Sequence, residues 1–208
     1  MTPPLNIALL DRYTWKLRNA LAEARLNVHT SGMYLDPANP DSCCSKLTYR
    51  STRAVLDAMR LRPRDVFFDI GCGKGRVLCC AAQVPLRRVV GIEMNPEAAA
   101  AARANSARMR GRRAPVQVIE GDARKADYTD GTAFYLFNPF GADVLRAVLE
   151  RIRATLDYNP RSVRFAYTYP RHEFVLEGCG WLQLTDSWPT RPDLGISHQT
   201  SFWQSRDS

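Results

Sequence analysis

Three glycines alternate with other residues in the segment Asp69 to Gly75, which reads Asp-Ile-Gly-Cys-Gly-Lys-Gly. The apolar run Val66 to Ile70 leads into this segment, and a helical stretch begins after Gly75, so the pattern predicts a tight turn from a strand into a helix. Glycine tolerates positive φ and lets a ligand approach the main chain closely. The turn therefore predicts a ligand-binding loop.

The spacing of these glycines argues against a dinucleotide site. The dinucleotide fingerprint requires two residues between its second and third glycines, whereas only one residue separates Gly73 from Gly75. In addition, the position that follows is Arg76, and the acidic Asp69 precedes the first glycine. A pyrophosphate cradle is therefore not the favoured interpretation.

Two further carboxylates follow later apolar runs. Glu93 ends the second run, where a carboxylate can accept hydrogen bonds from two ribose hydroxyls. Asp122 follows the third run, within Gly121-Asp122-Ala123, and can accept a hydrogen bond from the exocyclic amine of adenine. Because parallel strands end at one edge of a sheet, Asp69, Glu93 and Asp122 together predict a polar rim for a nucleoside.

These segments match a known family. Asp69 to Gly75, Val90-Gly91-Ile92-Glu93 and Gly121-Asp122-Ala123 resemble the first three motifs of the class I S-adenosylmethionine-dependent methyltransferases. The resemblance covers roughly residues 49 to 170 and implies a Rossmann-like domain with S-adenosyl-L-methionine as cofactor. It also implies that the glycine turn faces the methionine part of the cofactor, Glu93 the ribose and Asp122 the adenine.

The resemblance extends to a segment ahead of the glycine turn. Tyr49-Arg50-Ser51-Thr52 is similar to the Tyr-x-x-Ser/Thr element of histone-modifying and mitochondrial-type lysine methyltransferases, and the ensemble resembles their small bacterial relatives. Ser51 or Thr52 as the N-cap of a helix explains these residues almost as well. The predicted cofactor-binding residues are Tyr49, Thr52, Asp69, Gly71, Cys72, Gly73, Gly75, Glu93, Met94, Asp122, Ala123 and Asn138.

A fourth motif bears on the chemistry. Asn138-Pro139-Phe140 is similar to the Asn/Asp-Pro-Pro-aromatic motif of amine-directed methyltransferases, with one proline missing. A nitrogen nucleophile must align its lone pair with the methyl group, so the carbonyl of Asn138 can orient the N–H groups of the acceptor. The ring of Phe140 can stabilise the developing positive charge. Asn138, Pro139 and Phe140 are the predicted catalytic group, and the alternative is a plain turn that ends a strand.

The rest of the chain predicts the elements that position these residues. Short apolar strands alternate with helices, which is typical of a mostly parallel sheet covered on both faces. The predicted fold class is α/β, with a Rossmann-like seven-stranded sheet that ends in an antiparallel C-terminal strand pair. The predicted strands are Val66 to Ile70, Val89 to Glu93, Val116 to Glu120, Ala133 to Phe137, Val163 to Tyr169, Trp181 to Trp188 and Ser197 to Gln204.

The first part of the chain differs from this alternation. Residues 5 to about 26 carry apolar side chains at helical spacing and predict an amphipathic helix that packs on the domain or covers a cleft. We interpret residues 1–48 as this helix with a lid and substrate loop, and residues 49–208 as the S-adenosylmethionine-binding methyltransferase domain. Further helices are predicted from roughly Ser51 to Met59, after Gly75, from Pro96 with Asn95 as N-cap, and from about Ala142 to Thr155.

The charge of the chain invites an acidic partner. Its 208 residues include 29 Lys and Arg against 21 Asp and Glu, which gives a net charge of +8. The arginines nevertheless cluster before the predicted strands, on the face opposite the cofactor, where cations complement helix dipoles. Nucleic acid is therefore a possible partner but not the favoured one. Without a long apolar run or a secretory signal, we expect a cytoplasmic protein with no membrane partner.

The six cysteines show no C-x-x-C spacing and no interleaved histidines, so no metal site is predicted. In-line methyl transfer requires positioning and exclusion of water rather than a metal. We interpret the cysteines as buried reduced thiols, with redox interest confined to Cys43-Cys44. His172 is either a base near the cleft or an exposed loop histidine.

These observations predict an enzyme, an S-adenosylmethionine-dependent methyltransferase that N-methylates an amine of a protein or small-molecule substrate. Two alternatives stay open. In the first, the chain is a methyltransferase whose acceptor is an RNA base or an oxygen of a small molecule. In the second, it is a non-catalytic S-adenosylmethionine-binding module that regulates a partner. Neither the identity of the acceptor nor the oligomeric state follows from the sequence.

Overall fold

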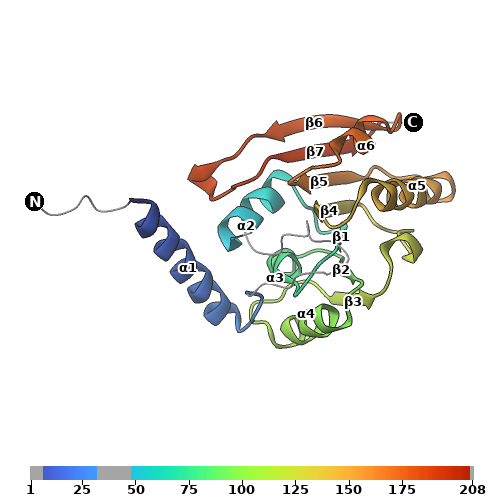
Figure 1. The fold of residues 1–208 in the computed structure, drawn as a ribbon. Helices are drawn as coiled ribbons and strands as arrows, with labels where there is room; N and C mark the ends of the chain where they lie inside the picture. The colour runs from blue at the N-terminus through green and yellow to red at the C-terminus, as the bar shows by residue number, and fades with distance from the viewer. Residues whose placement is uncertain (1–6, 32–47, 207–208) are drawn as a thin grey trace, which may run out of the picture.

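The structure is a computed structural model that describes residues 7–31 and 48–206, with side chains from residue 14 onward in the first segment. Seven strands form one sheet (Figure 1). They are β1 (Val66–Ile70), β2 (Arg88–Glu93), β3 (Val116–Glu120), β4 (Ala133–Phe137), β5 (Arg164–Thr168), β6 (Leu182–Trp188) and β7 (Thr200–Ser205).

The order of the strands in the sheet is β3-β2-β1-β4-β5-β7-β6. The first five are mutually parallel, whereas β7 runs antiparallel to both β5 and β6. This confirms the predicted fold class. The chain moves outward from β1 to β3 and then returns to β4 on the other side of β1, so β1 and β4 flank the switch point of the sheet. In open α/β sheets, ligands bind outside the carboxyl ends of the strands at such a point.

Helices cover both faces of the sheet (Figure 1). They are α1 (Ile7–Leu26), α2 (Tyr49–Ala58), α3 (Arg76–Ala81), α4 (Pro96–Arg108), α5 (Ala142–Tyr158) and α6 (Glu173–Glu177), with the 3-10 turns η1 (Ala123–Lys125) and η2 (Pro192–Leu194). In α5, Leu145, Val148, Leu149 and Ile152 form the buried stripe, at the spacing expected of an amphipathic helix.

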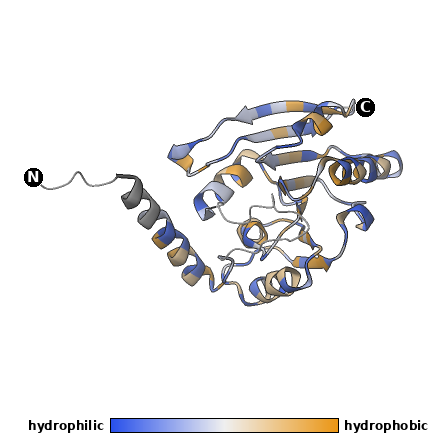
Figure 2. Ribbon diagram, in the orientation of Figure 1, coloured by the Kyte–Doolittle hydropathy of each residue, from blue (hydrophilic) through white to orange (hydrophobic). Residues whose placement is uncertain are grey.

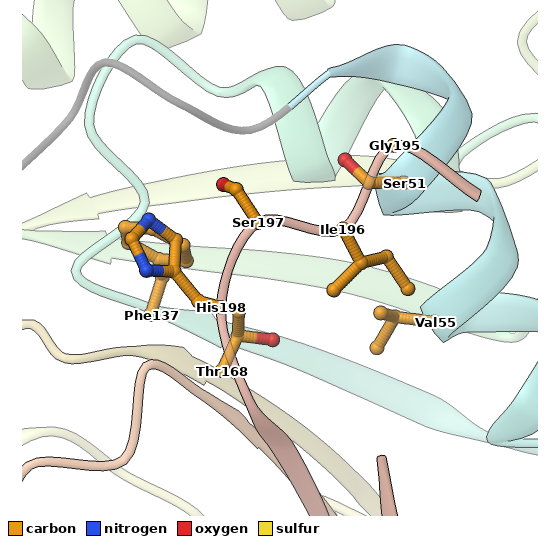
Figure 3. A pocket seen from close by; sticks show the side chains of 8 residues that line it. All are labelled: Ser51, Val55, Phe137, Thr168, Gly195, Ile196, Ser197 and His198. Atoms are coloured by element: carbon orange, nitrogen blue, oxygen red, sulfur yellow. The ribbon is translucent and has the colours of Figure 1, made fainter. Parts of the chain in front are cut away.

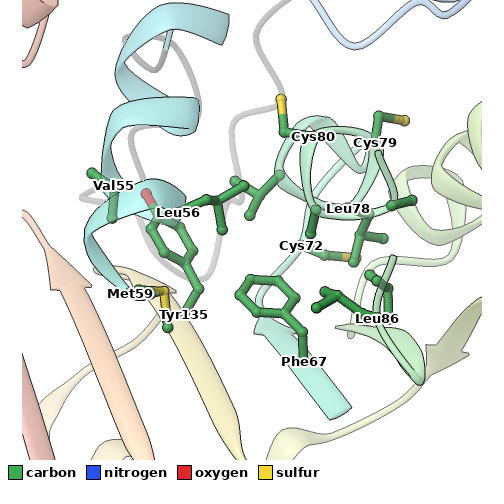
Figure 4. Close-up of a cluster of buried hydrophobic side chains, with 14 of the residues drawn as sticks. Val55, Leu56, Met59, Phe67, Cys72, Leu78, Cys79, Cys80, Leu86 and Tyr135 are labelled. Carbon is green, nitrogen blue, oxygen red and sulfur yellow. The ribbon is translucent and has the colours of Figure 1, made fainter. Parts of the chain in front are cut away.

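Alternation along β1 divides the core in two. Phe67 joins a cluster with residues of α2 and α3, whereas its neighbour Phe68 joins a cluster with residues of α5 and α6. Figure 4 shows the first cluster, with Phe67 and Tyr135 between α2 and α3. Every residue of β1 is buried, which is why this strand reads as a continuous apolar run interrupted only by Asp69.

Helix α1 packs on the domain over only part of its length. Leu17 is 61% exposed and Leu21 is 60% exposed, and the helix stands away from the sheet with hydrophobic residues in view (Figure 2). Its second half contacts the domain: Asn19 is buried and accepts a hydrogen bond from Tyr49 N (3.1 Å), and Ala22 packs against the core. Leu26, at the end of the helix, and Val28, just beyond it, are buried. Most of the predicted lid loop lies outside the described residues, and so do both Cys43 and Cys44.

Several local predictions need correction. Neither Ser51 nor Thr52 is the N-cap of α2, because the cap is Thr48, which forms a capping box with Ser51 as the third helical residue. Asn95 does cap α4, where its side chain accepts a hydrogen bond from Ala98 N (2.8 Å). The final strand begins at Thr200 rather than Ser197. Helix α6 was not predicted, because five residues are too few for a clear helical period.

The cysteines largely follow the prediction. Cys72, Cys79 and Cys80 are buried free thiols, while Cys179 is only half-buried. Burial raises the pKa of Cys79 and of Cys80 to about 12. Among the described residues, no group of three or more His, Cys, Asp or Glu side chains is placed to hold a metal ion. Within the same ranges, no helix is long and apolar enough to cross a membrane.

Candidate functional site

The carboxyl ends of β1 to β4 bring the predicted residues to one edge of the sheet. Asp69 lies near the end of β1, Glu93 ends β2, Asp122 follows β3 and Asn138 follows β4. Because the strand order is β3-β2-β1-β4, these residues line the edge on both sides of the switch point.

The glycine loop after β1 has a backbone conformation that residues with a side chain rarely adopt. Gly71, Gly73 and Gly75 have φ of 78°, 53° and 83°, in the left-handed region. A Cβ on Gly71 would lie 2.4 Å from Cβ of Pro139, so this glycine lets the turn after β4 pack directly on the loop. A Cβ on Gly73 would meet no described atom within 4 Å. Gly71 therefore joins two motifs, while Gly73 leaves open space.

Asp69 is a buried carboxylate, with an exposure of 3%. Its Oδ2 has no hydrogen-bond partner among the described residues. Burial raises the pKa of Asp69 well above the usual value, and the nearby charge of Glu93 raises it further. Burying a carboxylate oxygen without a hydrogen bond costs folding free energy. A hydrogen-bond donor on a bound ligand would offset this cost at Asp69.

Glu93 holds the glycine loop. Its Oε2 accepts a hydrogen bond from Gly73 N (2.8 Å), and its Oε1 accepts one from Asn95 N (2.9 Å). Each carboxylate oxygen can accept a second hydrogen bond. Glu93 thus combines a structural contact with spare acceptor capacity at the edge where a ribose is expected.

Asp122, the residue predicted to meet adenine, is bonded to its neighbour Arg124. Its carboxylate accepts hydrogen bonds from Arg124 N (2.9 Å), Arg124 Nε (3.0 Å) and Arg124 Nη2 (2.6 Å). These bonds hold the pKa of Asp122 below its usual value. Ala123, the next residue, begins η1. An adenine amine would therefore have to share the oxygens of Asp122 with Arg124.

Asn138 has an unusual backbone for a residue other than glycine, with φ of 37°. It is 3% exposed. Because Leu136 pairs with Tyr167 in the sheet, Asn138 and Tyr167 share a face. The Tyr167 hydroxyl donates to Asn138 Oδ1 (3.3 Å), and burial raises the pKa of Tyr167 to about 12. Tyr167 was not among the predicted site residues, since in the sequence it is one more aromatic of an apolar strand.

Tyr169, which directly follows β5, also has positive φ, at 53°. The pair Phe137 and Thr168 is the last in register between β4 and β5, so the two left-handed residues Asn138 and Tyr169 follow side by side. Such strained residues persist where the surroundings fix them and cluster at functional sites.

A small cavity lies beside these strand ends, between Phe137, Thr168, α2 and the loop before β7 (Figure 3). Its lining residues are Ser51, Val55, Phe137, Thr168, Gly195, Ile196, Ser197 and His198. The His198 ring lies 4.5 Å from the ring of Tyr169 and 5.7 Å from that of Phe137, between centroids. No local pattern predicts this aromatic group, because its members are distant in the chain.

The other predicted residues occupy varied environments. Tyr49 is buried, and its hydroxyl lies 2.8 Å from Thr30 Oγ1. Thr52 is fully buried, and its Oγ1 has no partner among the described residues. Cys72 is buried in the loop, whereas Met94 is 61% exposed. Phe140 is half-buried and packs partly on the cluster under α5. His172 is the N-cap residue of α6, and its main-chain N–H donates to the Tyr167 hydroxyl (3.4 Å).

These features fit a ligand of the expected kind. S-adenosylmethionine carries hydrogen-bond donors on its ammonium group, its ribose hydroxyls and its adenine amine. The edge supplies Oδ2 of Asp69, which has no partner among the described residues, and the spare acceptor capacity of Glu93. At Gly73, where no atom of residues 7–31 or 48–206 would come within 4 Å of a Cβ, such a ligand can approach the main chain.

Comparison with known proteins agrees with this picture. Residues 67–159 match a family described as a methyltransferase domain. Over 127 residues, the chain is 25% identical to a protein-lysine N-methyltransferase of Saccharolobus islandicus, and the match spans 61% of this chain and 73% of that protein.

Two solved structures share the fold. A TehB-like S-adenosylmethionine-dependent methyltransferase of Corynebacterium glutamicum has a TM-score of 0.57 at 17% identity, covering 97% of this chain and 100% of that one. An RNA methyltransferase of Salinibacter ruber, in complex with S-adenosyl-L-homocysteine, has a TM-score of 0.52 at 21% identity, covering 76% of this chain and 91% of that one. At these identities the likeness shows the fold alone.

Proposed function

The chain carries a class I, Rossmann-like S-adenosylmethionine-dependent methyltransferase domain, and on this premise we propose that it methylates an amine nitrogen of a protein or a small molecule. The supporting observation is the position of Asn138. Its side chain is buried, and its backbone is in the left-handed region. It follows Phe137, the last residue of β4, and it precedes Pro139, which packs on Gly71 of the glycine loop.

In this proposal the cofactor lies along the carboxyl ends of β1 to β3. Asp69 and the glycine loop meet its methionine part, Glu93 meets the ribose, and Asp122 with Ala123 meets the adenine. Bound there, S-adenosylmethionine supplies a methyl group on a sulfonium, which an in-line nucleophile can accept. The acids also complement the positive charge of the cofactor.

Asn138 acts on the acceptor rather than the cofactor. The Tyr167 hydroxyl occupies one acceptor direction of Oδ1, and the amide oxygen has a second lone pair for an N–H of the acceptor amine. That hydrogen bond turns the nitrogen lone pair toward the methyl group. The ring of Phe140 stabilises the positive charge that develops on nitrogen, and the proton released afterwards leaves to solvent.

The relative in Saccharolobus islandicus is named for methylation of protein lysine, which supports an amine acceptor for this chain. The direct experiment is transfer of labelled methyl from S-adenosylmethionine to a cell lysate, with label counted separately in protein, RNA and small-molecule fractions. Label on nitrogen in protein or small molecules supports the proposal. Label confined to RNA or to oxygen contradicts it, and no label with tight cofactor binding favours a regulatory module.

The variant that tests the mechanism is Asn138→Ala. We expect turnover to fall on the order of 100-fold or more, with little change in cofactor affinity, because the contact belongs to the aligned acceptor. Alanine is strained at positive φ, so Asn138→Gly serves as the control that keeps the backbone relaxed. Turnover per folded molecule is measured with the melting temperature. A stable and fully active Asn138→Gly protein would contradict the mechanism.

A further inference from the structure

Residues His29–Ser31, which we call the N-terminal strap, follow α1 and lie beside the glycine loop. The helix ends in a Schellman motif, in which Asn27 has φ of 57° and Val28 N–H donates to Glu23 O (3.0 Å). Val28 is fully buried and fixes the turn of the chain. The strap therefore has a defined path, although most of the described side chains of α1 before it are exposed.

Thr30 is the first anchor between the strap and the loop. Its Oγ1 donates to Glu23 Oε1 (2.7 Å), accepts from Arg76 Nε (3.0 Å) and lies 2.8 Å from the Tyr49 hydroxyl. A threonine hydroxyl has one proton and two acceptor positions. Since its proton goes to Glu23, Tyr49 must donate to it. All three positions of the hydroxyl are then filled, so Thr30 links α1, α2 and α3 at one atom.

Asn105 is the second anchor, and it is fully buried on α4. Its Oδ1 accepts from His29 N (2.9 Å), and its Nδ2 donates to His29 O (3.0 Å) and to Lys74 O (2.9 Å). One amide therefore joins the main chain of the strap to the main chain of the glycine loop. This contact is independent of Thr30.

Arg76 connects these anchors to the loop itself. It is the first residue of α3 and directly follows Gly75, whose φ is 83°. Its guanidinium lies 3.5 Å from Glu23 Oε1, donates to Ser31 Oγ (2.9 Å) and stacks over the Tyr49 ring, 5.1 Å from the centroid. Both charged side chains of the ion pair are about one-eighth exposed, at 13% and 12%. Poor access to water strengthens such a pair.

We propose that the N-terminal strap is a positioning device for the cofactor: Thr30 holds Arg76, and Arg76 holds the glycine loop in the conformation that binds S-adenosylmethionine. The inference concerns the cofactor and does not depend on the acceptor being an amine. Because coupling between two sites is reciprocal, bound cofactor must in turn stabilise the strap and the end of α1.

The test compares Thr30→Val with Thr30→Ser by calorimetry of S-adenosyl-L-homocysteine binding to the full chain. Valine keeps the shape but removes all three side-chain hydrogen bonds, and serine keeps them. We expect affinity to fall on the order of 10-fold in Thr30→Val and to return to within about 2-fold in Thr30→Ser. Thr129→Val is the matched control, since its hydroxyl bonds Asp127 at the opposite edge of the sheet.

Hydrogen exchange provides a readout that a merely structural role would not move. Bound S-adenosyl-L-homocysteine should slow amide exchange at residues 28–31 in the wild type, and by less in Thr30→Val. If Thr30→Val does not fold, Arg76→Lys replaces it, because lysine keeps the charge but lacks Nε and the planar stack. A folded Thr30→Val or Arg76→Lys protein with wild-type affinity, or a strap whose exchange ignores the ligand, overturns the proposal.

Discussion

Two aspartates at opposite ends of β1 have opposite environments. Asp65 precedes the strand and is 4% exposed, and Asp69 lies near its carboxyl end and is 3% exposed. Asp65 accepts hydrogen bonds from Arg62 N (2.6 Å), Thr132 Oγ1 (2.9 Å) and Arg164 Nη2 (2.6 Å). Oδ2 of Asp69 has no partner within the described residues.

The pKa values of the two carboxyls follow this difference. Burial works to raise the pKa of Asp65, but the hydrogen bonds from Arg62, Arg164 and Thr132 outweigh it, so the pKa is lowered. For Asp69, burial raises the pKa, and the charge of Glu93 acts in the same direction. Both carboxylates are almost fully buried, but Asp65 has partners that make it part of the fold. Asp69 lacks a hydrogen-bond donor at Oδ2, and a ligand bound at this edge can supply one.

The arginines at the amino ends of the strands also bind groups of this chain, which distinguishes them from a surface for a partner. Arg164 binds Asp65 and also donates to the carbonyls of Met59 and Arg60 beyond α2. Arg88 pairs with Asp130 (2.7 Å), and Arg161 donates to the carbonyls of Gly131 and Tyr128. These arginines hold loops together, so part of the positive charge has a structural use.

The largest effect expected is on stability at the amino-end edge. Arg164→Met keeps the aliphatic stem but leaves Asp65 buried without its cation, so we expect a loss of about 3 kcal/mol and a melting temperature lower by about 6–12 °C. Affinity for S-adenosyl-L-homocysteine should be retained at temperatures where the variant is folded. Lost affinity with unchanged stability would break the comparison.

This loss should depend on pH in a defined direction. The folded-state pKa of Asp65 is lowered, so its contribution is present above the unfolded pKa of about 3.9 and disappears as the pH falls through the folded value. The difference in unfolding free energy between wild type and Arg164→Met should therefore shrink below about pH 4. Urea denaturation at several pH values measures it.

At the carboxyl-end edge, Glu93→Ala should reduce affinity for S-adenosyl-L-homocysteine by about 1.5–3 kcal/mol, the range for hydrogen bonds to a charged group. Glu120→Ala is the matched control. Glu120 pairs with Glu93 in the sheet register and is also the last residue of its strand, but it forms an exposed ion pair with Arg103. Calorimetry of both variants should show the loss in Glu93→Ala alone. Equal affinities would remove Glu93 from the site.

Much of this edge could be predicted because it is local. The strand that ends in Asp69, the glycines after it and the acid at Glu93 are read along a few residues, and parallel pairing then brings them together. The contacts of Thr30 with Arg76, and of Tyr167 with Asn138, join residues far apart in the chain through ordinary polar or aromatic side chains. The exposure of Leu17 and Leu21 on α1 could not be predicted, because helical periodicity indicates an apolar stripe but not what covers it.

The smallest effect, and the one with opposite signs, is expected for Asp69→Asn. The amide has the same shape and carries no charge, so removing an unpartnered buried carboxylate should stabilise the ligand-free protein by about 1 kcal/mol, or about 2–4 °C in melting temperature. The gain should be small near pH 4 and grow toward neutral pH, because the raised pKa of Asp69 makes the wild type lose stability as the pH rises through that value. Affinity for S-adenosyl-L-homocysteine should instead fall on the order of 10-fold, since the charged acceptor is gone. Thermal melts at several pH values and calorimetry together measure both signs. A variant that is less stable and binds as tightly as the wild type would place Asp69 with Asp65, as a structural carboxylate.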